Sequence, residues 1–265
     1  MGTARDADLT APVEWSERDR VAVVMLNRPR VLNALNRAVL ARLDDILQEI
    51  GRHEDTYRVV LLTGAGGNFS AGDDLKEAAA LTREERYAAL DAFQALTLRV
   101  LDLPQPVIAV LDGWVVGGAL ELSLACDMRI ASERARFFTP EVTRGLLISN
   151  ASSVLLPLVV GPGRAREMVY GGRVYDAAWA YEAGLVNAVL PAEKLMEDAM
   201  ARGREIARQA ADAVRAAKRL FIAPMRPTVV TALENERREG RALADSPALK
   251  EGLEAFLDRR PGEFD

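Results

Sequence analysis

The chain alternates short strand-like runs with helix-like runs up to about residue 190, and this alternation limits the folds that it can adopt. Val21–Leu26 is an apolar, largely β-branched run that ends shortly before Pro29, and apolar residues then follow a helical spacing from Val39 to Ile50. Further strands are predicted at 58–63, 106–111, 128–131 and 185–190, with a hairpin-like return at 135–138. Further helices are predicted at 82–103 and 117–126 and near Asn150, Gly163 and Asp176. Strands that alternate with helices indicate an α/β fold with a largely parallel sheet.

From about residue 191 onward the pattern is helical only. Residues 210–221 are rich in alanine, and residues 229–257 carry many charges with few apolar positions. Such helices bury little apolar surface by themselves, so we expect them to pack on a neighbour. The sequence therefore predicts a core of residues 1–195 and a C-terminal helical region of residues 196–265.

The chain has only one histidine, His53, and one cysteine, Cys126, among its 265 residues. This excludes a zinc site of the Cys/His kind, a CxxC redox pair and an internal disulfide. A catalytic triad would have to use His53, which follows a helix-like stretch among charged residues and is better interpreted as a solvated loop histidine. Metal catalysis would have to rest on carboxylates, and we expect no metal. Cys126 is expected to be a small buried hydrophobic residue.

The charge balance is slightly acidic, with 34 lysines and arginines against 39 aspartates and glutamates. We therefore expect neither nucleic acid nor an anionic membrane as a partner. The first ten residues contain no apolar signal core, so secretion is not expected. An uncharged run at 145–163 holds serines, an asparagine and two prolines, which favours a buried helix over a membrane span. These observations predict a protein of the reducing cytoplasm.

Two glycine-rich segments are candidates for a site made of backbone N–H groups. Residues 64–75 follow a strand and lack the features of a phosphate-binding or dinucleotide-binding loop. They either direct N–H groups into a cleft or connect to a helix capped by Asp73 or Asp74. In residues 112–121, two glycines begin an apolar helix and leave N–H groups that can bind an anion, although close packing against a strand explains them equally well.

Two glutamates are candidates for acid and base chemistry. Glu121 lies in an apolar helix, so its carboxylate either follows a narrow wet stripe, pairs with an arginine or belongs to a site. Glu141 follows Thr139 and Pro140, a position that also suits an ordinary first-turn glutamate of a helix. Combined with the two N–H segments, the glutamates form a more specific pattern. Backbone donors can hold an oxyanion while two carboxyl groups are kept in different protonation states.

The order and spacing of these motifs resemble the enoyl-CoA hydratase/isomerase (crotonase) superfamily over nearly the whole chain. The matching motifs are LNRP (26–29), NAL (33–35), LTG (62–64), FSAGDDL (69–75), PVIA (106–109), GWVVGG (113–118), ACD (125–127), FTPE (138–141), AGLV (183–186) and EGLEAF (251–256). The resemblance implies a spiral of strand-strand-helix turns, followed by a helical region that assembles trimers or hexamers and completes the substrate site. It also implies an acyl-CoA thioester substrate, with coenzyme A part of the substrate and no separate cofactor, and a place in fatty acid metabolism.

Site residues follow from the resemblance by position. The oxyanion-hole donors correspond to the backbone N–H groups of Asp73 and Gly118. Positions that correspond to substrate or CoA contacts are Arg28, Arg30, Ala71, Gly72, Gly117 and Ser149. Arg28 and Arg30 are available near a phosphate, and Arg259 or Arg260 is a weaker candidate for another phosphate contact.

Both glutamates of the hydratase pattern are present, which selects hydration among the reactions of the family. The expected reaction is reversible syn addition of water across the double bond of a trans-2-enoyl-CoA, giving a 3-hydroxyacyl-CoA. Ionised Glu121 would accept a proton from water, and protonated Glu141 would donate one to Cα. The alternatives are an enoyl-CoA isomerase that needs a single glutamate, a lyase or hydrolase of other CoA esters, and a non-catalytic CoA-binding or RNA-binding subunit.

Two features depart from the family pattern. A glycine-rich stretch is common after Glu141, whereas this chain has Ser149-Asn150-Ala151-Ser152-Ser153, and Ser149 stands where a glycine N–H often contacts the attacking water. The other departure is Asp73, because an acid beside an oxyanion hole opposes charge development unless its side chain points away. We therefore expect an unusual acyl pocket.

Overall fold

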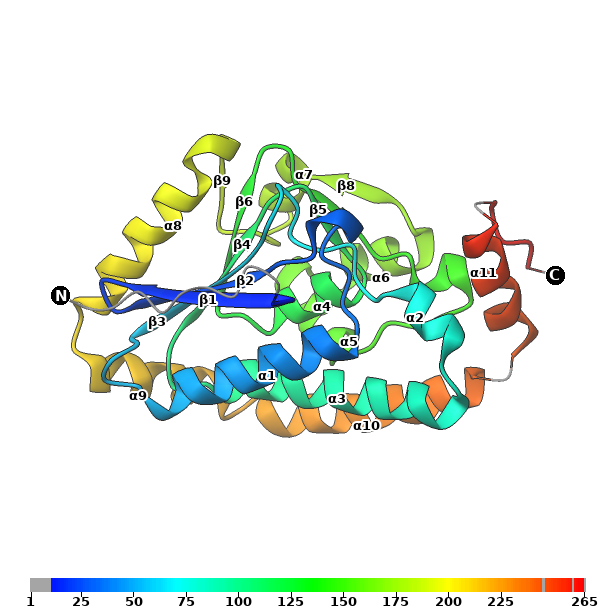
Figure 1. Cartoon of the computed structure of the whole chain (residues 1–265), viewed down its shortest axis with the longest axis horizontal. Coiled ribbons are helices and arrows are strands. Elements are labelled where there is room, and N and C mark those ends of the chain that lie inside the picture. The colour runs from blue at the N-terminus through cyan, green and yellow to red at the C-terminus, as the bar shows by residue number, and fades with distance from the viewer. Residues whose placement is uncertain (1–10, 245, 259, 265) are drawn as a thin grey trace.

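A six-stranded sheet forms the centre of the computed structural model, which describes residues 11–244, 246–258 and 260–264 (Figure 1). The strands are β1 (Val13–Arg18), β2 (Val21–Leu26), β3 (Val59–Gly64), β4 (Val107–Leu111), β6 (Met128–Ser132) and β9 (Ala188–Leu190), in the spatial order β1-β2-β3-β4-β6-β9. Every neighbouring pair is parallel except β1 with β2. The predicted α/β fold with a largely parallel sheet is confirmed.

A second sheet has three strands, and two of them follow directly in the chain after β4 and β6 of the first sheet. It contains β5 (Trp114–Val116), β7 (Arg136–Phe138) and β8 (Val174–Asp176), with β7 parallel to β5 and antiparallel to β8. The predicted hairpin-like return at 135–138 is therefore wrong. Neighbouring strands β4 and β6 each end in a tight turn and continue as β5 and β7, so β7 pairs with β5 and not with β6. This arrangement buries Phe137 completely.

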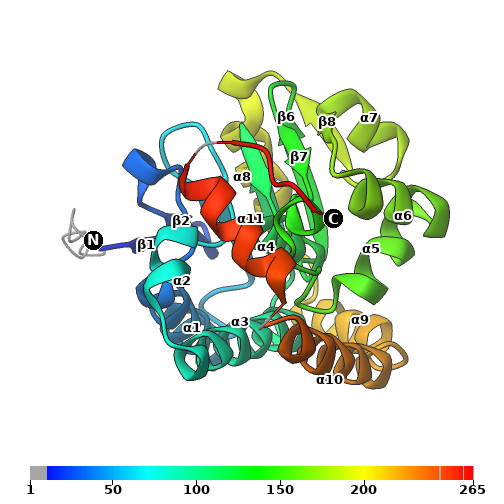
Figure 2. The same ribbon diagram turned by 90° about the vertical axis from the view of Figure 1, so that its right-hand side faces the viewer.

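Helices surround both sheets. They are α1 (Arg37–Arg52), α2 (Leu75–Ala80), α3 (Arg83–Asp102), α4 (Gly118–Leu124), α5 (Ser152–Val160), α6 (Pro162–Gly171), α7 (Ala177–Glu182), α8 (Ala192–Ala207), α9 (Ala211–Ile222), α10 (Arg226–Leu243) and α11 (Pro247–Leu257), with short 3₁₀ helices η1 (Pro29–Val31) and η2 (Glu141–Arg144). The predicted helical C-terminal region is confirmed by α8 to α11. Figure 2 shows α11 crossing one end of the molecule, where it packs on η2 and α2.

The large sheet is covered on both faces. On one face α8 places Leu195, Ala199 and Met200 against residues of β2, β3, β4 and β6. On the other face α1 buries the apolar stripe that its sequence predicts, and Asn36 caps its first turn by accepting a hydrogen bond from Val39 N at 2.9 Å. Each fully buried leucine or isoleucine of such a stripe stabilises the fold by roughly 1.5–3 kcal/mol. The predicted division between residues 195 and 196 falls inside α8 and remains a prediction.

The uncharged run at 145–163 forms α5 and the loop before it. Its helix buries Leu155, Leu156 and Val160, whereas Leu158 is 64% exposed, so the expected burial is confirmed for one face of the helix only. In the part of the chain that the structure describes, no helix is both long enough and apolar enough to cross a membrane. The first ten residues, on which the expectation about secretion rests, lie outside the described part.

Candidate active site

The first glycine-rich loop is fixed by the side chain of Asn33. Its Nδ2 donates to the carbonyl oxygens of Ala65 and Asn68, both at 2.8 Å, and its Oδ1 accepts from the backbone N–H of Arg28 at 2.9 Å. Ser70 holds the next part of the loop, because its hydroxyl donates to the Asn33 carbonyl and accepts from Gly72 N. These buried hydrogen bonds make the loop rigid where it approaches the second sheet.

Backbone bridges bring the loop beside the start of α4. Ser70 N donates to the carbonyl oxygen of Trp114 at 2.9 Å, and Val116 N donates to that of Ser70 at 3.1 Å. A Cβ on Gly72, which has φ +79°, would lie 2.5 Å from the Val116 carbonyl oxygen and 3.5 Å from Gly118 N. Only glycine allows the two segments to approach this closely.

The N–H groups of Asp73 and Gly118 meet at this junction. In the described chain, neither of these N–H groups donates to another backbone carbonyl. Gly117 has φ +52°, and a Cβ there would lie 2.8 Å from Glu141 Oε1, so glycine is required again. Backbone N–H groups of two different segments therefore lie near each other beside a carboxyl group, which is the arrangement that an oxyanion hole requires.

Glu121 is buried and surrounded by hydrogen-bond donors. Its Oε1 accepts from Ser149 N at 2.7 Å and from the Ser152 hydroxyl at 2.8 Å, and its Oε2 accepts from the Ser149 hydroxyl and from Asn150 Nδ2, both at 2.8 Å. Glu121 therefore does not follow a wet stripe, and it pairs with no arginine of the described residues. Burial raises the pKa of Glu121, the negative charge of Glu141 raises it further, and the Ser149 and Ser152 donors oppose this shift.

Glu141 begins η2 and has a different environment. Its Oε2 is buried and has no hydrogen-bond partner among the described residues. Burial is the main cause that raises the pKa of Glu141 to about 7; the charge of Asp73 adds to it, and Arg144 opposes it. An unpartnered oxygen on a carboxyl group that is protonated near neutral pH can donate a proton to a bound molecule.

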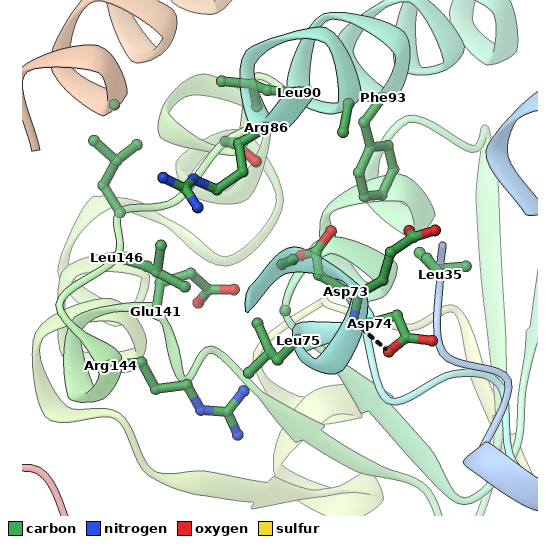
Figure 3. A pocket seen from close by; sticks show the side chains of 18 of the residues that line it. Leu35, Asp73, Asp74, Leu75, Arg86, Leu90, Phe93, Glu141, Arg144 and Leu146 are labelled. Carbon is green, nitrogen blue, oxygen red and sulfur yellow. Dashed lines mark hydrogen bonds between the residues drawn. The ribbon is translucent and has the colours of Figure 1, made fainter. Parts of the chain in front are cut away.

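Asp73 directs its carboxylate into the same space. Figure 3 shows Asp73 and Glu141 pointing into one cavity from opposite sides, with Arg144 on the same wall as Glu141. Desolvation within the cavity raises the pKa of Asp73 to about 6, and its own N–H, the charge of Arg144 and the Gly118 N–H oppose this shift. The Arg144 guanidinium also lies 4.9 Å from the centre of the Phe256 ring of α11. The Asp73 side chain therefore does not point away from the N–H pair.

The cavity has a volume of about 240 Å³ and extends from α1 and α2 to α10 and α11. Site residues predicted from the sequence that line it are Ala71, Gly72, Asp73, Gly117, Glu121, Glu141 and Ser149. Gly118 is not among the lining residues, but it follows Gly117, which is. Apolar side chains of α3 and of the segment after η2, among them Leu90, Phe93 and Leu146, line the remainder.

Three of the predicted arginines, Arg28, Arg30 and Arg260, lie outside the lining of this cavity. Arg28 donates through Nη1 to the Ala34 carbonyl at 2.7 Å and to Asp74 Oδ2 at 3.0 Å, so it ties the η1 loop to the start of α2. Arg30 is exposed on η1. Arg260 pairs with Glu251 on α11, and Arg259 lies outside the described residues.

Sequence reasoning missed the residues that set the environment of the two glutamates. Asn150 and Ser152 belong to the segment that departs from a glycine-rich pattern, and this departure is the signal that could have identified them as ligands of Glu121. Arg144 follows Glu141 by three residues in η2, a spacing that places both on one side of a 3₁₀ helix. Asn33 offered a weaker signal, since it precedes the loop by more than 30 residues.

The remaining candidate residues lie as expected. Asp74 caps α2 by accepting from Glu77 N at 3.3 Å. His53 is exposed at the end of α1, and Cys126 is buried. In the ranges that the structure describes, no group of three or more His, Cys, Asp and Glu side chains is arranged to hold a metal ion.

Two buried carboxyl groups in one cavity, beside backbone N–H groups of two segments, define the class of this protein as an α/β protein with a candidate acid–base site. Comparison with known proteins is consistent with this class. A family model described as enoyl-CoA hydratase/isomerase matches residues 16–265. The chain therefore belongs to the enoyl-CoA hydratase/isomerase family, and its fold is the crotonase fold that the resemblance implied.

Individual relatives match this chain over almost their full lengths. The 2,3-dehydroadipyl-CoA hydratase of Escherichia coli is 34% identical over 257 residues, which cover 94% of this chain and 96% of the relative. The crotonyl-CoA hydratase of Syntrophomonas wolfei is 31% identical over 255 residues, which cover 94% and 95%. The crystal structure of an enoyl-CoA hydratase/isomerase from Pseudoalteromonas atlantica matches with a TM-score of 0.86 at 32% identity, over 96% of this chain and 100% of that one.

Proposed function

We propose that this protein is an enoyl-CoA hydratase, which adds water syn across the double bond of a trans-2-enoyl-CoA to give a 3-hydroxyacyl-CoA. Two buried carboxyl groups line one cavity beside two backbone N–H groups that donate to no backbone carbonyl among the described residues, and this arrangement carries the proposal. The names of the E. coli and S. wolfei relatives support the same reaction. They also suggest short straight-chain and dicarboxylic enoyl groups as the first substrates to test.

Each group has a distinct task in this reaction. The N–H groups of Asp73 and Gly118 polarise the thioester carbonyl and stabilise the enolate that forms as water attacks Cβ. Losing one such donor typically raises the barrier by about 2.7–4 kcal/mol. Glu121 accepts a proton from the water, and Glu141 donates one to Cα through its unpartnered Oε2. Water is consumed, and the proton that Glu121 gained returns to Glu141 before the next cycle.

The two glutamates differ in the way that this mechanism requires. Four donors stabilise the charge of Glu121, whereas no donor reaches Oε2 of Glu141 among the described residues. This difference favours ionised Glu121 and protonated Glu141 in the resting site. Because the two charges interact, the pair is expected to titrate as a unit.

The rest of the substrate would occupy two sides of the site. The apolar cavity wall formed by Leu90, Phe93 and Leu146 is suited to the acyl chain. The loops that contain Arg28, Arg30 and Ala71 are suited to coenzyme A, with the arginines near its phosphates. We propose no cofactor besides the coenzyme A that the substrate carries.

We further propose a homo-oligomer, either a trimer or a hexamer, in the cytoplasm. The side chains of Leu220 and Phe221 on α9 are 76% and 78% exposed, and such large apolar groups on one helix are suited to contact with another subunit.

The test is a panel of 2-enoyl-CoA esters with short, long, branched and dicarboxylic acyl groups. Loss of the conjugated thioester absorbance measures turnover, and mass spectrometry identifies the product. We expect a product heavier than the substrate by one water, and we expect Glu141→Gln to abolish most of it. Turnover without a 3-hydroxyacyl product would contradict hydration.

A second candidate function is isomerisation of a 3-enoyl-CoA to a 2-enoyl-CoA. One observation favours it: all four hydrogen-bond positions of the Glu121 carboxylate are filled by protein donors, which leaves Glu141 as the carboxyl group with a free oxygen. A single glutamate could then move a proton between carbon atoms. Paired incubations of 2-enoyl-CoA and 3-enoyl-CoA esters in ¹⁸O-labelled water separate the reactions. A hydratase gives a labelled 3-hydroxyacyl product from the 2-enoyl ester, whereas an isomerase converts the 3-enoyl ester to an unlabelled 2-enoyl ester.

A further inference from the structure

Glu236 of α10 is a buried carboxylate that the proposed reaction does not use. It is 6% exposed and lines the cavity. Its Oε2 accepts from Ala151 N at 2.8 Å, and its Oε1 accepts from Ser153 N at 3.0 Å and from the Ser153 hydroxyl. Ala151 precedes the first turn of α5 and has no side chain that could cap it, so a carboxylate 85 positions away in the sequence supplies the cap.

The residues that donate to Glu236 alternate along the chain with those that donate to Glu121. The donors to Glu121 are Ser149, Asn150 and Ser152. Helix α5 contacts both α4, which carries Glu121, and α10, which carries Glu236. One short turn, residues 149–153, therefore supplies hydrogen bonds to two carboxylates from two different helices.

This turn has a conformation that needs support from its surroundings. Asn150 and Ala151 are consecutive residues with positive φ, at +54° and +62°. Left-handed residues other than glycine are unfavourable and persist only where neighbouring groups determine them. The hydrogen bond from Ala151 N to Glu236 acts on one of these two residues directly.

The part of α10 that carries Glu236 is itself fixed by Gln94 of α3, which is 1% exposed. Gln94 Nε2 donates to the Leu233 carbonyl at 3.1 Å, and its Oε1 accepts from Arg237 Nη2 at 2.8 Å. Leu233 precedes Glu236 by three residues and Arg237 follows it directly. The Glu236 carboxylate therefore comes from a well-anchored turn of its helix.

We propose that Glu236 is a positioning residue for Glu121, because it holds residues 150 and 151 in the conformation that presents the turn's donors to the Glu121 carboxylate. Glu236 acts through the turn and not on the substrate. Without it the turn can relax, and Glu121 then loses donors to its ionised form and its fixed orientation. This inference rests on the proposed function, since it takes Glu121 as the base that accepts a proton from water.

The test compares Glu236→Gln with Glu234→Gln, a matched control on the exposed side of α10. The amide of Glu236→Gln keeps the size of the side chain but turns an NH₂ group toward donors of the turn. We expect kcat for hydration of the best enoyl-CoA to fall about tenfold, and the acidic limb of the kcat profile to move to higher pH because Glu121 has lost donors. The affinity for butanoyl-CoA, a saturated thioester that cannot be hydrated, should stay within about twofold. The control should match the wild type in all three measurements.

Thermal unfolding checks that the variants fold. If Glu236→Gln does not fold, Glu236→Asp takes its place, because it keeps the negative charge and only shortens the reach to the two N–H groups. The same loss of kcat, with unchanged affinity for butanoyl-CoA, is expected of it.

A double variant shows whether Glu236 acts through the donors of Glu121. Ser152→Ala removes one of these donors, so the substitution at Glu236 has less left to disturb in that background. We expect the double variant to turn over about threefold faster than the product of the two single effects.

Three results would overturn the proposal: an unchanged kcat and pH profile in Glu236→Gln, a loss of butanoyl-CoA affinity as large as the loss of kcat, or single effects that simply multiply. A wild type that hydrates enoyl-CoA no faster than Glu236→Gln contradicts this inference alone. If the wild type gave no 3-hydroxyacyl-CoA from any ester of the panel, the proposed function would fail and this inference with it.

Discussion

The hydroxyl oxygen of Ser152 lies 2.8 Å from Oε1 of Glu121 and also 2.5 Å from the carbonyl oxygen of Ser149. A hydroxyl has a single proton, so Ser152 can donate to one of these two oxygens at a time. When Glu121 is ionised, Ser152 donates to it. When Glu121 has gained a proton, it can donate to Ser152, which then donates to the Ser149 carbonyl. The network therefore satisfies Glu121 in both protonation states, as a general base requires.

This relationship predicts the effect of Ser152→Ala. The variant removes the acceptor at Oε1 of a protonated Glu121 and one donor to the ionised form, so we expect turnover of the best enoyl-CoA to fall by about tenfold or more. Loss of the donor also raises the pKa of Glu121 further, so the limb of the pH profile that reports its ionisation should move to higher pH. The measurement is kcat against pH.

Ser153→Ala is the matched control for this variant. The Ser153 hydroxyl donates to Glu236 of α10 and not to Glu121, and Glu236 keeps the backbone N–H groups of Ala151 and Ser153 as donors. We expect this control to keep an unshifted pH profile. Equal effects of both substitutions would argue against the proton exchange at Ser152.

The two glutamates should respond differently to substitution by glutamine. At Glu141 the free Oε2 can become an amide group without meeting a donor, so Glu141→Gln should fold normally. At Glu121 every oxygen faces donors, so the amide of Glu121→Gln must face at least one N–H or O–H group, and we expect a loss of about 1–3 kcal/mol in the free energy of unfolding. Hydration should fall by roughly 10²-fold or more in both. Urea unfolding at pH 6 and product analysis test this, and equal stability of the two variants would contradict the donor network.

The raised pKa of Glu141 has a consequence for stability. The group ionises near 4.5 in the unfolded chain and near 7 in the folded one. Between these two pH values the folded state binds more protons than the unfolded chain. The stabilisation that Glu141 contributes is therefore fully present below pH 4.5 and is lost as pH rises through 7. Glu141→Gln does not ionise, and we expect it to exceed the wild type by about 1–3 kcal/mol at pH 8 while differing little at pH 4.

Urea unfolding across this range measures the difference. Glu234→Gln on the exposed side of α10 serves as a control and should follow the wild type at every pH. A Glu141 variant whose advantage did not grow between pH 4 and pH 8 would show that the carboxyl group is not desolvated.

Much of the fold follows from the sequence because strong periodic signals specify it. The buried run Val107–Leu111 predicts a central strand, and the apolar stripe of Arg37–Arg52 predicts an amphipathic helix. The strands β5 and β8 were missed because three residues are too few to establish an alternating pattern. Their pairing with β7 is decided by tertiary contacts and not by local preference.

The sequence likewise predicts some features of the candidate site and misses others. Glycines beside Asp73 and Gly118 reveal the backbone donors, because close approach of two backbones leaves a local signal in the sequence. The partners of Glu121 leave a weaker signal, because Ser149 and Ser152 follow it by about 30 residues and serines occur in many surroundings. Only the departure from a glycine-rich pattern marks their segment. The direction of the Asp73 side chain depends on a rotamer, and no sequence pattern specifies that.

The segment that replaces the glycine-rich stretch contains backbone strain. Asn150 and Ala151 have φ of +54° and +62°, so the left-handed positions are these two and not Ser149. Asparagine tolerates this region, whereas an alanine there costs roughly 1–2 kcal/mol. We therefore expect Ala151→Gly to increase the free energy of unfolding by about 0.5–1 kcal/mol, while its N–H keeps the hydrogen bond to Glu236. Ala88→Gly, at an exposed position of α3, should lower it by about 1 kcal/mol. A decrease for both in denaturant unfolding would mean that Ala151 is not strained.

The chemistry proposed here needs neither His53 nor Cys126. His53 accepts or donates only at the exposed end of α1, where Nδ1 lies 2.9 Å from the Glu49 carbonyl oxygen. Burial raises the pKa of the Cys126 thiol to about 12, which keeps it neutral and a poor nucleophile. We expect His53→Gln and Cys126→Ala to retain turnover within about twofold, with a loss of about 1 kcal/mol in unfolding free energy for Cys126→Ala because it leaves a small cavity. Steady-state kinetics on the best enoyl-CoA, together with urea unfolding, test both variants. A folded variant of either residue without turnover would show that the two glutamates and two backbone amides are not the complete catalytic set.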